Sequence, residues 1–404
     1  MKMVEDAKTI FSAALKRVDP SLMIRELVTL EGGKLTIRTE TESCSFDLDS
    51  YDEVLVIGAG KAGAKMALGL EAVLGDRISS GLVAVKEGHT EELSRVELIE
   101  AGHPMPDKRS VEAGTRIAGL CAAAGEKSLI LNLISGGGSA ILTAPYSDDT
   151  RTVTLEELQQ VTGLLLACGA PIQEINVIRK HLSAVKGGRL AGLAAPAAMV
   201  SLILSDVIGD PLDAIASGPT VPDPTTWENA AEIIRAYDLQ QKLPESVAAL
   251  LADGTAGKIS DTPDETSGIF ESVSNILIGT NISALQAASE EAERLGYSPV
   301  ILTSQLTGEA REIAKLFSAM AKDLCLGRLA FPRPACIITG GETTVTLKGE
   351  GKGGRNQEMA LAFLREYLES PEALEGVLFL SGGTDGNDGP TDAAGGIAHR
   401  GILE

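Results

Sequence analysis

Glycine-rich stretches that carry a cation or small hydroxyl groups are the parts of this sequence best suited to chemistry. In the first, an apolar run from Val54 is followed by the G-x-G-x-x-G pattern of Gly58, Gly60 and Gly63, with Lys61 inside the loop. Glycine lets the backbone turn sharply and lets a ligand approach bare N–H groups, and the start of a following helix favours an anion. We therefore expect this loop to bind a phosphate or a carboxylate. The alternative is a tight strand-to-helix turn with its lysine in solvent.

A second glycine loop, Ser135-Gly136-Gly137-Gly138-Ser139, follows the apolar run 128–134. It offers several backbone N–H groups and two hydroxyls, which suit a carboxylate or a phosphate. The pattern is not G-x-S-x-G, so it does not predict the nucleophile elbow of a hydrolase. A flexible loop without a ligand is the alternative.

Basic residues gather between residues 172 and 189, although the chain as a whole has a formal net charge of −21. The overall field repels an anionic substrate, so an anion site needs local Lys and Arg. Arg179 and Arg189 are the candidates. A position on a solvated helix face explains Lys180 as well as an anion site does. His181 is better explained as a packing histidine than as a catalyst.

Carboxylates follow two of the predicted strands. Asp206 ends an apolar run and could hold Mg²⁺ through water or accept a proton from a substrate hydroxyl. Asp385 and Asp388 lie in a glycine-rich loop that lacks the closing Glu of an EF-hand, which argues against calcium. They are candidates for Mg²⁺ or hydroxyl contacts, with capping of the loop as the alternative. Arg355 stands at a predicted helix entrance after a glycine run, where bidentate contact with an anion is favoured.

Strands that alternate with helices must position these loops, and this alternation predicts an α/β fold with parallel sheets. Ligands of open parallel sheets bind beyond the carboxyl ends of the strands. Five predicted strands end in glycine or small polar residues, at Gly58, Ser135, Ser205-Asp206, Gly340 and Ser381. We therefore expect two α/β domains with a cleft between them.

The predicted domains span 1–252 and 273–404, joined by a polar linker at 253–272 with little periodicity. The chain is expected to open with an amphipathic helix. A helix is predicted from Pro171 to about Val185, and an edge strand at 343–347.

Composition excludes several classes of protein. The 404 residues are 44% hydrophobic, which is typical of globular proteins, and no stretch is long and apolar enough to span a membrane. The acidic charge disfavours nucleic-acid binding. The five scattered cysteines form no C-x-x-C and are expected to be reduced. The charged N-terminus lacks a secretory apolar core, so we expect a cytoplasmic protein.

Taken together, these motifs resemble the type-2 glycerate kinases, whose C-terminal half is the MOFRL domain. The resemblance covers nearly the whole chain, and the motifs occur in the family order. They are Gly58-Ala-Gly-Lys61-Ala, Gly102-His-Pro-Met-Pro-Asp107, Ser135-Gly-Gly-Gly-Ser-Ala140, Asn176-x-x-Arg179-Lys-His-Leu-Ser183 with Lys186-Gly-Gly-Arg189, Ser205-Asp-Val-x-Gly-Asp210, Ser217-Gly-Pro-Thr220, Gly340-Gly-Glu-Thr343, Gly353-Gly-Arg-Asn-Gln-Glu358 and Gly382-Gly-Thr-Asp385-Gly-x-Asp388-Gly-Pro-Thr-Asp-Ala393.

The resemblance implies phosphorylation of D-glycerate by ATP with Mg²⁺, in most microbial members at the 2-hydroxyl. It also implies a Rossmann-like N-terminal domain, a distinct α/β C-terminal domain of the MOFRL type, and an active site between them. Lys61 and Arg355 occupy the positions of the lysine and arginine regarded as catalytic in the family. Family members usually continue past Gly396 with another strand and a G-P-T-x-T-N-V motif. The sequence stops at Glu404 without it, so we expect a second domain that is truncated or lacks that element.

The expected mechanism divides the site into three parts. Lys61 and Arg355 neutralise the transferring phosphoryl group from opposite domains. The loop Ser135–Ser139, with Arg179 or Arg189, holds the glycerate carboxylate, and Asn281 is a further candidate for substrate binding. Asp206 or Asp385 serves Mg²⁺ or orients the hydroxyl. Positions expected near the nucleotide or metal are Gly58, Gly60, Gly340, Gly341, Glu342, Asp385 and Asp388.

Two other functions stay open at the level of sequence. An NAD(P)H-dependent hydroxypyruvate reductase is suggested by G-x-G-x-x-G and by Glu87 at a distance suited to a ribose contact. A non-catalytic sugar-acid sensor would bind the ligand without turnover. A monomer or a homodimer is expected in each case.

Overall fold

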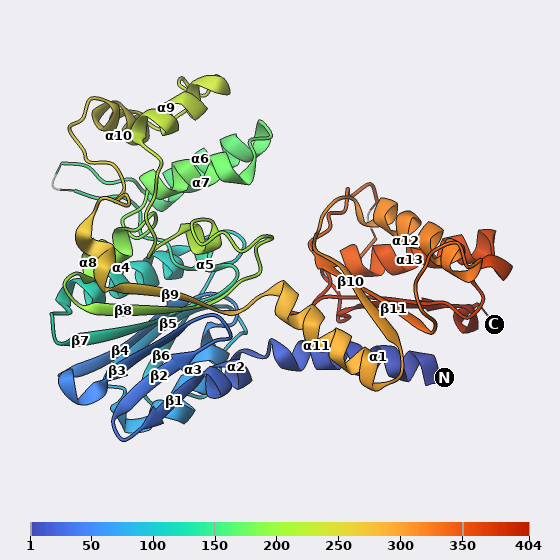
Figure 1. Ribbon diagram of the computed structural model, residues 1–404. Helices are drawn as coiled ribbons and strands as arrows, with labels where there is room; N and C mark the ends of the chain where they lie inside the picture. The colour runs from blue at the N-terminus through green and yellow to red at the C-terminus, as the bar shows by residue number, and fades with distance from the viewer. Residues whose placement is uncertain (1, 149, 350, 404) are drawn as a thin grey trace. The chain divides into compact units, whose positions relative to one another are not determined.

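The protein divides into two compact units in a computed structural model that describes residues 2–148, 150–349 and 351–403. The larger unit comprises residues 20–280, and the smaller one joins the first 19 residues to those from 281 onward. Figure 1 shows strands and helices in both, and the α/β class predicted from the sequence is confirmed.

A six-stranded parallel sheet forms the centre of the larger unit, in the order β6-β5-β4-β7-β8-β9. Its strands are β4 (Glu53–Ala59), β5 (Ser80–Lys86), β6 (Val96–Ala101), β7 (Ser128–Ile134), β8 (Ala198–Leu204) and β9 (Val273–Gly279). Strand β4 pairs with β5 on one side and with β7 on the other, so the strand order reverses there. Such a switch point is where ligands bind in open parallel sheets.

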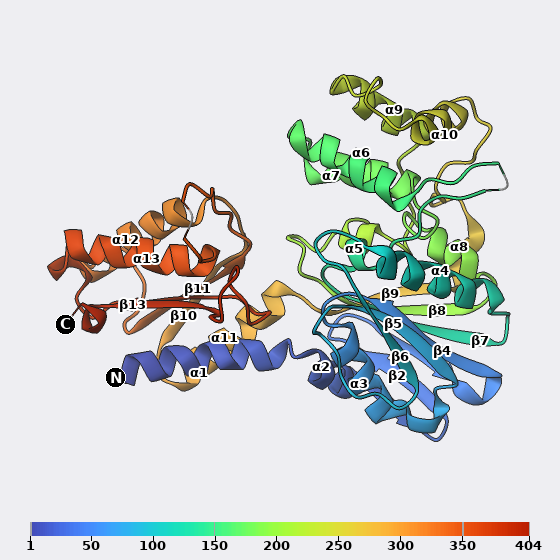
Figure 2. The ribbon, with the colours of Figure 1, turned by 180° about the vertical axis from the view of Figure 1, so that it is seen from behind.

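Helices cover both faces of this sheet, as Figures 1 and 2 show. On one face lie α2 (Pro20–Leu27) and α3 (Gly63–Leu74), and on the other α4 (Lys108–Ala123), α5 (Gly138–Ile141) and α8 (Arg189–Ala194). All seven residues of β7 are buried, which is expected for a central strand covered on both sides. A small antiparallel sheet of β1 (Val28–Glu31), β2 (Lys34–Arg38) and β3 (Ser43–Asp47) completes this part.

Four helices of the larger unit share a separate core around Trp227. They are α6 (Leu155–Ala167), α7 (Ile172–His181), α9 (Trp227–Ala236) and α10 (Glu245–Thr255). No element was predicted from the sequence for the residues of α9, and none for those of α10. The sequence analysis also placed the end of α7 at about Val185, four residues beyond His181, where the helix ends.

The segment 253–272 is part of the larger unit and not a linker between the units. The carboxylate of Asp261 accepts a hydrogen bond from the backbone N–H of Trp227 at 2.6 Å, and the side chain of Thr262 is buried. The next strand, β9, is the sixth strand of the large sheet. The expected boundary at 273 therefore lies too early, because β9 pairs with β8 rather than opening a second sheet.

The described residues of the smaller unit form two strand pairs and four α-helices. Strands β10 (Ser298–Leu306) and β11 (Ala335–Gly341) are parallel, and β12 (Leu378–Gly382) and β13 (Gly395–His399) are antiparallel. Helices α1 (Lys2–Arg17) and α11 (Asn281–Arg294) pack together, as do α12 (Ala310–Cys325) and α13 (Arg355–Glu369). The edge strand expected at 343–347 is reduced to one isolated bridge between Glu309 and Thr344.

Short 3-10 helices connect several of these elements: η1 (Leu48–Ser50), η2 (Gly75–Arg77), η3 (Ile215–Ser217), η4 (Gly268–Ser272), η5 (Glu372–Leu374) and η6 (Arg400–Ile402). Within the described ranges, no helix has the length and apolar character needed to traverse a bilayer.

Candidate active site

The two glycine loops at the switch point are hydrogen-bonded to each other. The backbone N–H of Lys61 donates to the carbonyl oxygen of Gly136 at 2.9 Å, and that of Ala62 donates to the hydroxyl oxygen of Ser135 at 3.0 Å. Gly60 has a φ of +138°, and a Cβ there would lie 2.2 Å from the hydroxyl oxygen of Ser135. Only glycine permits this approach, so the spacing of the first motif is what joins the two loops. At Gly58, β4 likewise runs so close to β7 that a Cβ would lie 2.3 Å from the carbonyl oxygen of Leu133.

Three side chains lie against the backbone of the second loop. A Cβ at Gly136 would lie 1.8 Å from Oδ2 of Asp206. A Cβ at Gly137 would lie 3.0 Å from Nε2 of His103 and 3.4 Å from Cγ of Lys61. The structure therefore brings Lys61 and Asp206 to the same loop, from the carboxyl ends of β4 and β8.

His103 is a member of this site that the sequence analysis did not select. The motif Gly102–Asp107 contained it, but a single His in a loop carries no periodic signal. Its imidazole is half-buried. Burial and the positive charges of Lys61, Lys86 and His89 lower the pKa of His103, so this ring is neutral at pH 7.

Buried polar contacts support the second loop from behind. The hydroxyls of Ser139 and Ser217 share a hydrogen bond at 2.7 Å, and the latter donates to Oδ1 of Asn176 at 3.4 Å. Ser217 has a φ of +62°, a left-handed conformation that costs a non-glycine residue free energy. The ammonium of Lys186 donates to the carbonyl oxygens of Ser139 at 2.7 Å and Leu142 at 2.8 Å. Burial, with the charge of Arg179, lowers the pKa of Lys186 to about 7.

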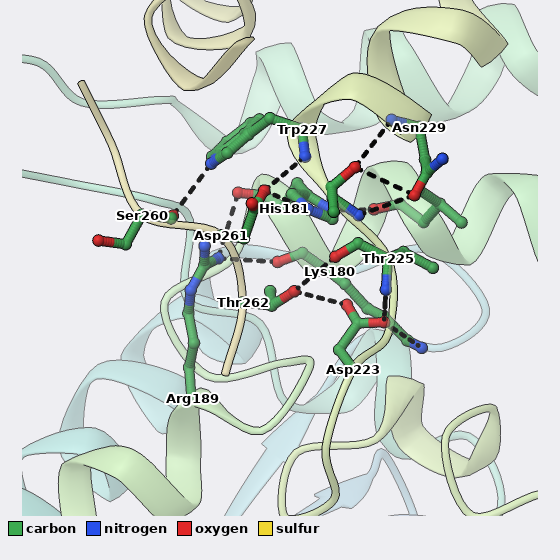
Figure 3. Close-up of polar contacts among 12 residues, drawn as sticks. Lys180, His181, Arg189, Asp223, Thr225, Trp227, Asn229, Ser260, Asp261 and Thr262 are labelled. Carbon is green, nitrogen blue, oxygen red and sulfur yellow. Dashed lines mark hydrogen bonds and ion pairs between the residues drawn. The ribbon is translucent and has the colours of Figure 1, made fainter. Parts of the chain in front are cut away.

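Two of the predicted basic residues are used inside the fold (Figure 3). Nη1 of Arg189 donates to three carbonyl oxygens near the end of α7, at 2.9, 3.2 and 2.5 Å, those of Lys180, His181 and Ser183. These bonds add a side-chain donor to carbonyls at the end of the helix, where intrahelical partners run out. Lys180 is buried and forms ion pairs at 3.3 Å with Asp213 and with the buried Asp223, so it does not lie on a solvated face.

His181 is a packing histidine, as the sequence suggested. It is fully buried, its Nδ1 is 2.9 Å from the carbonyl oxygen of Val177, and its ring meets the Trp227 ring edge to face at 4.8 Å. The carboxylate of Asp261 lies 3.9 Å from Nε2 of His181 (Figure 3). Burial lowers the pKa of His181.

Arg179 is the second arginine predicted to bind an anion, and unlike Arg189 it does not bond backbone carbonyls of the described residues. Within the described residues, its partly buried guanidinium forms no hydrogen bond or ion pair. Burial lowers its pKa. It follows Asn176 by one turn of α7, on the helix that supports the second loop. A partly desolvated cation in such a place favours an anionic ligand.

In the smaller unit, predicted residues gather at the carboxyl end of β11. Arg355, the first residue of α13, forms an ion pair with Glu342 at 2.5 Å. A Cβ at Gly340 would lie 2.3 Å from Oδ1 of Asn281, whose amide donates to the carbonyl oxygen of Ser304 at 2.6 Å.

Gly341 approaches the backbone of β10 in the same region, because a Cβ there would lie 2.1 Å from the carbonyl oxygen of Leu306. Asp388 is buried and accepts hydrogen bonds from the backbone N–H groups of Asn356 at 3.0 Å and Gln357 at 2.7 Å. It therefore caps the start of α13, which is the alternative that the sequence left open. Asp385 is exposed in the same loop.

The described residues alone supply too few carboxylates in one place for a metal site, so Mg²⁺ would depend on oxygens of a bound ligand. Among the residues described, no group of three or more His, Cys, Asp and Glu side chains could hold a metal ion. Mg²⁺ in phosphoryl-transfer sites is commonly held by one or two carboxylates together with phosphate oxygens. The exposed carboxylate of Asp206, placed beside the backbone of Gly136, is a donor of this kind.

Comparison with known proteins gives matches along nearly the whole chain. Residues 6–252 match a domain of unknown function, DUF4147, and residues 335–404 match the MOFRL family. A glycerate 2-kinase of Pyrococcus horikoshii is 39% identical over 398 residues, which cover 98% of this chain and 86% of the relative. A putative hydroxypyruvate reductase of Agrobacterium vitis is 42% identical over 85% of this chain and 75% of the relative. The crystal structure of a glycerate kinase from Thermotoga maritima matches with a TM-score of 0.82 and 36% identity, over 98% of this chain and 87% of that one.

Proposed function

Since this chain belongs to the glycerate kinase family, we propose that it transfers the γ-phosphoryl group of ATP to the 2-hydroxyl of D-glycerate, giving 2-phospho-D-glycerate and ADP. The main support for this proposal is that the side chains of Lys61 and Asp206 both lie against the glycine loop Ser135–Ser139. Phosphoryl transfer depends on positioning and on charge stabilisation, and a cation, a carboxylate and backbone donors supply both.

The substrate carboxylate is assigned to the second loop, Ser135–Ser139, with Arg179. In this loop the N–H groups of Ser135 and Gly138 and the hydroxyl of Ser139 already have partners, so the N–H groups of Gly136 and Gly137 are the donors assigned to the substrate. Arg179 has no hydrogen bond or ion pair within the described ranges. An arginine binds a planar carboxylate through two parallel hydrogen bonds. Arg189 is the weaker of the two predicted arginines for this role, because it already donates to backbone carbonyls.

The transferring phosphoryl group is assigned to Lys61 and Arg355. Both side chains are partly exposed, so both are accessible to a polyphosphate. Bound Mg²⁺ would neutralise charge on the phosphate oxygens, and Asp206 would hold it, with Asp385 as the second candidate. The glycines at the end of β11, Gly340 and Gly341, with Glu342, are assigned to the neighbourhood of the nucleotide. We expect the protein to act as a monomer or a homodimer in the cytoplasm, where ATP is supplied.

The reductase alternative is disfavoured because backbone N–H groups of the first loop, residues 58–63, already donate to other protein atoms. A dinucleotide pyrophosphate binds the N–H groups of G-x-G-x-x-G at the helix start. Here the N–H groups of Lys61 and Ala62 already donate to Gly136 and Ser135.

Two parallel incubations test the proposal. One contains D-glycerate, ATP and Mg²⁺ and is assayed for ADP, with the phosphorylated position read by phosphorus NMR. The other contains hydroxypyruvate with NADH or NADPH and is followed at the nicotinamide absorbance. We expect ADP and 2-phosphoglycerate in the first and no change in the second. Oxidation of the nicotinamide without ADP formation would assign the chain to the reductase class, and binding without turnover to the sensor class.

A further inference from the structure

We propose that His103 is the general base of this reaction, which accepts the proton of the glycerate hydroxyl. The inference rests on the proposed function. In the step, the hydroxyl O–H bond breaks and its proton moves to Nε2 of His103. The oxygen forms a bond to the γ-phosphorus, and the bond between that phosphorus and the bridging oxygen breaks, with its electron pair leaving on ADP. The proton then passes from the imidazolium to solvent.

The position of the ring is the first support for this assignment. Nε2 of His103 and Cγ of Lys61 lie 3.0 and 3.4 Å from one point, the place of a Cβ on Gly137. The imidazole therefore lies over the loop assigned to the substrate, beside the cation assigned to the phosphoryl group. A hydroxyl held between them would have a base on one side and the γ-phosphorus on the other, which is the arrangement that in-line transfer requires.

The second support is that the imidazole is not used by the fold. In the part of the chain that the structure describes, no hydrogen bond or ion pair engages either ring nitrogen of His103. His181 differs, since it is fully buried and bonded to a backbone carbonyl. A half-buried imidazole without a partner has a lone pair available to a ligand.

The charges around the ring keep it in the accepting form. Lys61 follows β4, and Lys86 ends β5 and precedes His89 by three residues. Burial and these cations lower the pKa of His103. The carboxylate of Asp107 lies in the same turn but is bonded to Ser110 and Arg109. A base must be unprotonated before the reaction, and its loss by protonation gives an acidic limb in the pH–rate profile.

The test is the pH dependence of kcat in His103→Gln, which keeps a polar side chain without a titratable nitrogen. The unchanged protein is expected to lose activity toward acid. The variant is expected to have a kcat lower by about 100- to 10,000-fold, a KM for D-glycerate within a few fold, and no acidic limb. An acidic limb that persists in the variant overturns the proposal, because another group must then carry the proton.

Further variants separate a catalytic role from a structural one. Free imidazole added to His103→Ala is expected to restore part of the turnover, whereas Lys61→Met is not expected to respond. His89→Gln removes a charge that lowers the pKa of His103, so the acidic limb should move to higher pH. His399→Gln is the matched control in the smaller unit and should leave the profile unchanged. Absence of imidazole rescue together with an unmoved limb in His89→Gln contradicts the assignment even where His103→Gln folds poorly. Failure of the unchanged protein to make ADP from D-glycerate instead refutes the proposed function.

Discussion

The substitution Gly136→Ala adds a single methyl group, which would collide with the carboxylate of Asp206. Gly136 does not have a φ in the left-handed region, so alanine fits the backbone. The new Cβ would lie 1.8 Å from Oδ2 and 2.3 Å from Cγ of Asp206, whereas real Cβ atoms essentially never approach closer than 3.0 Å. The carboxylate must therefore retreat by about 1 Å. A misplacement of about 1 Å in a catalytic constellation costs roughly 100-fold in rate.

The assay is steady-state ADP formation over a range of Mg²⁺ concentrations. If Asp206 holds the metal, we expect kcat to fall about 100-fold and the Mg²⁺ requirement to rise. The fold should persist, because a compatible Gly→Ala change alters the free energy of unfolding by only about 0.4–1 kcal/mol. Gly163→Ala is the matched control, since its added Cβ meets nothing within 4 Å in the exposed middle of α6. It should leave turnover unchanged.

A double-mutant cycle shows whether the methyl group acts through Asp206. In the background of Asp206→Ala, the change at Gly136 should have little further effect, because its target is gone. Normal turnover in Gly136→Ala would refute the assignment of Asp206. Full additivity of the two losses would show that Gly136 acts by another route.

Three further predictions concern cations and pH. Lys61→Met and Arg355→Ala should each lower kcat by orders of magnitude without unfolding the chain, and near-normal turnover in either removes that residue from the mechanism. The pKa of Lys186 is lowered from 10.5 to about 7, so between these values the unfolded chain binds more protons. The free energy of unfolding, measured with urea, should therefore rise between these two pH values by up to about 1.4 kcal/mol per pH unit. Lys186→Met should flatten this slope, and an unaltered slope would contradict the assignment. The pKa of His181 is lowered from 6.5 by burial, so its contribution to stability is present above pH 6.5 and is lost as the pH falls below it. The fluorescence of the sole tryptophan, Trp227, which the ring of His181 contacts, reports that loss. His181→Phe should abolish this loss of stability at acidic pH. Equal acid sensitivity of the two proteins would contradict the assignment of the loss to His181.

Much of the fold could be predicted because its signals are local. An apolar run followed by glycine and then by helical spacing identifies strand, loop and helix without reference to any distant residue. This is why β4, β7 and β8 were found, and why Gly58, Ser135 and Asp206 were predicted at the carboxyl ends of strands. The parallel order of strands follows from their alternation with helices.

Other features depend on contacts between residues far apart in sequence. Asp388 caps a helix that begins 33 residues earlier, at Arg355, and a loop of alternating carboxylates gives no sign of that partner. Arg189 was expected to bind an anion, but the end of α7 takes its Nη1 donors. Segment 253–272 was expected to be a linker, but its ends belong to α10 and η4, and between them Asp261 bonds the start of α9.

The sequence by itself determined which residues could do chemistry and which loops carry them, because glycine spacing and apolar runs act over a few residues. Only the tertiary structure decided which of those residues meet. It placed His103 over Gly137 and Asp206 beside Gly136, and it committed β9 to the large sheet. The physical reason is that hydrogen bonds, ion pairs and close backbone approaches depend on distance in space, which sequence separation does not set.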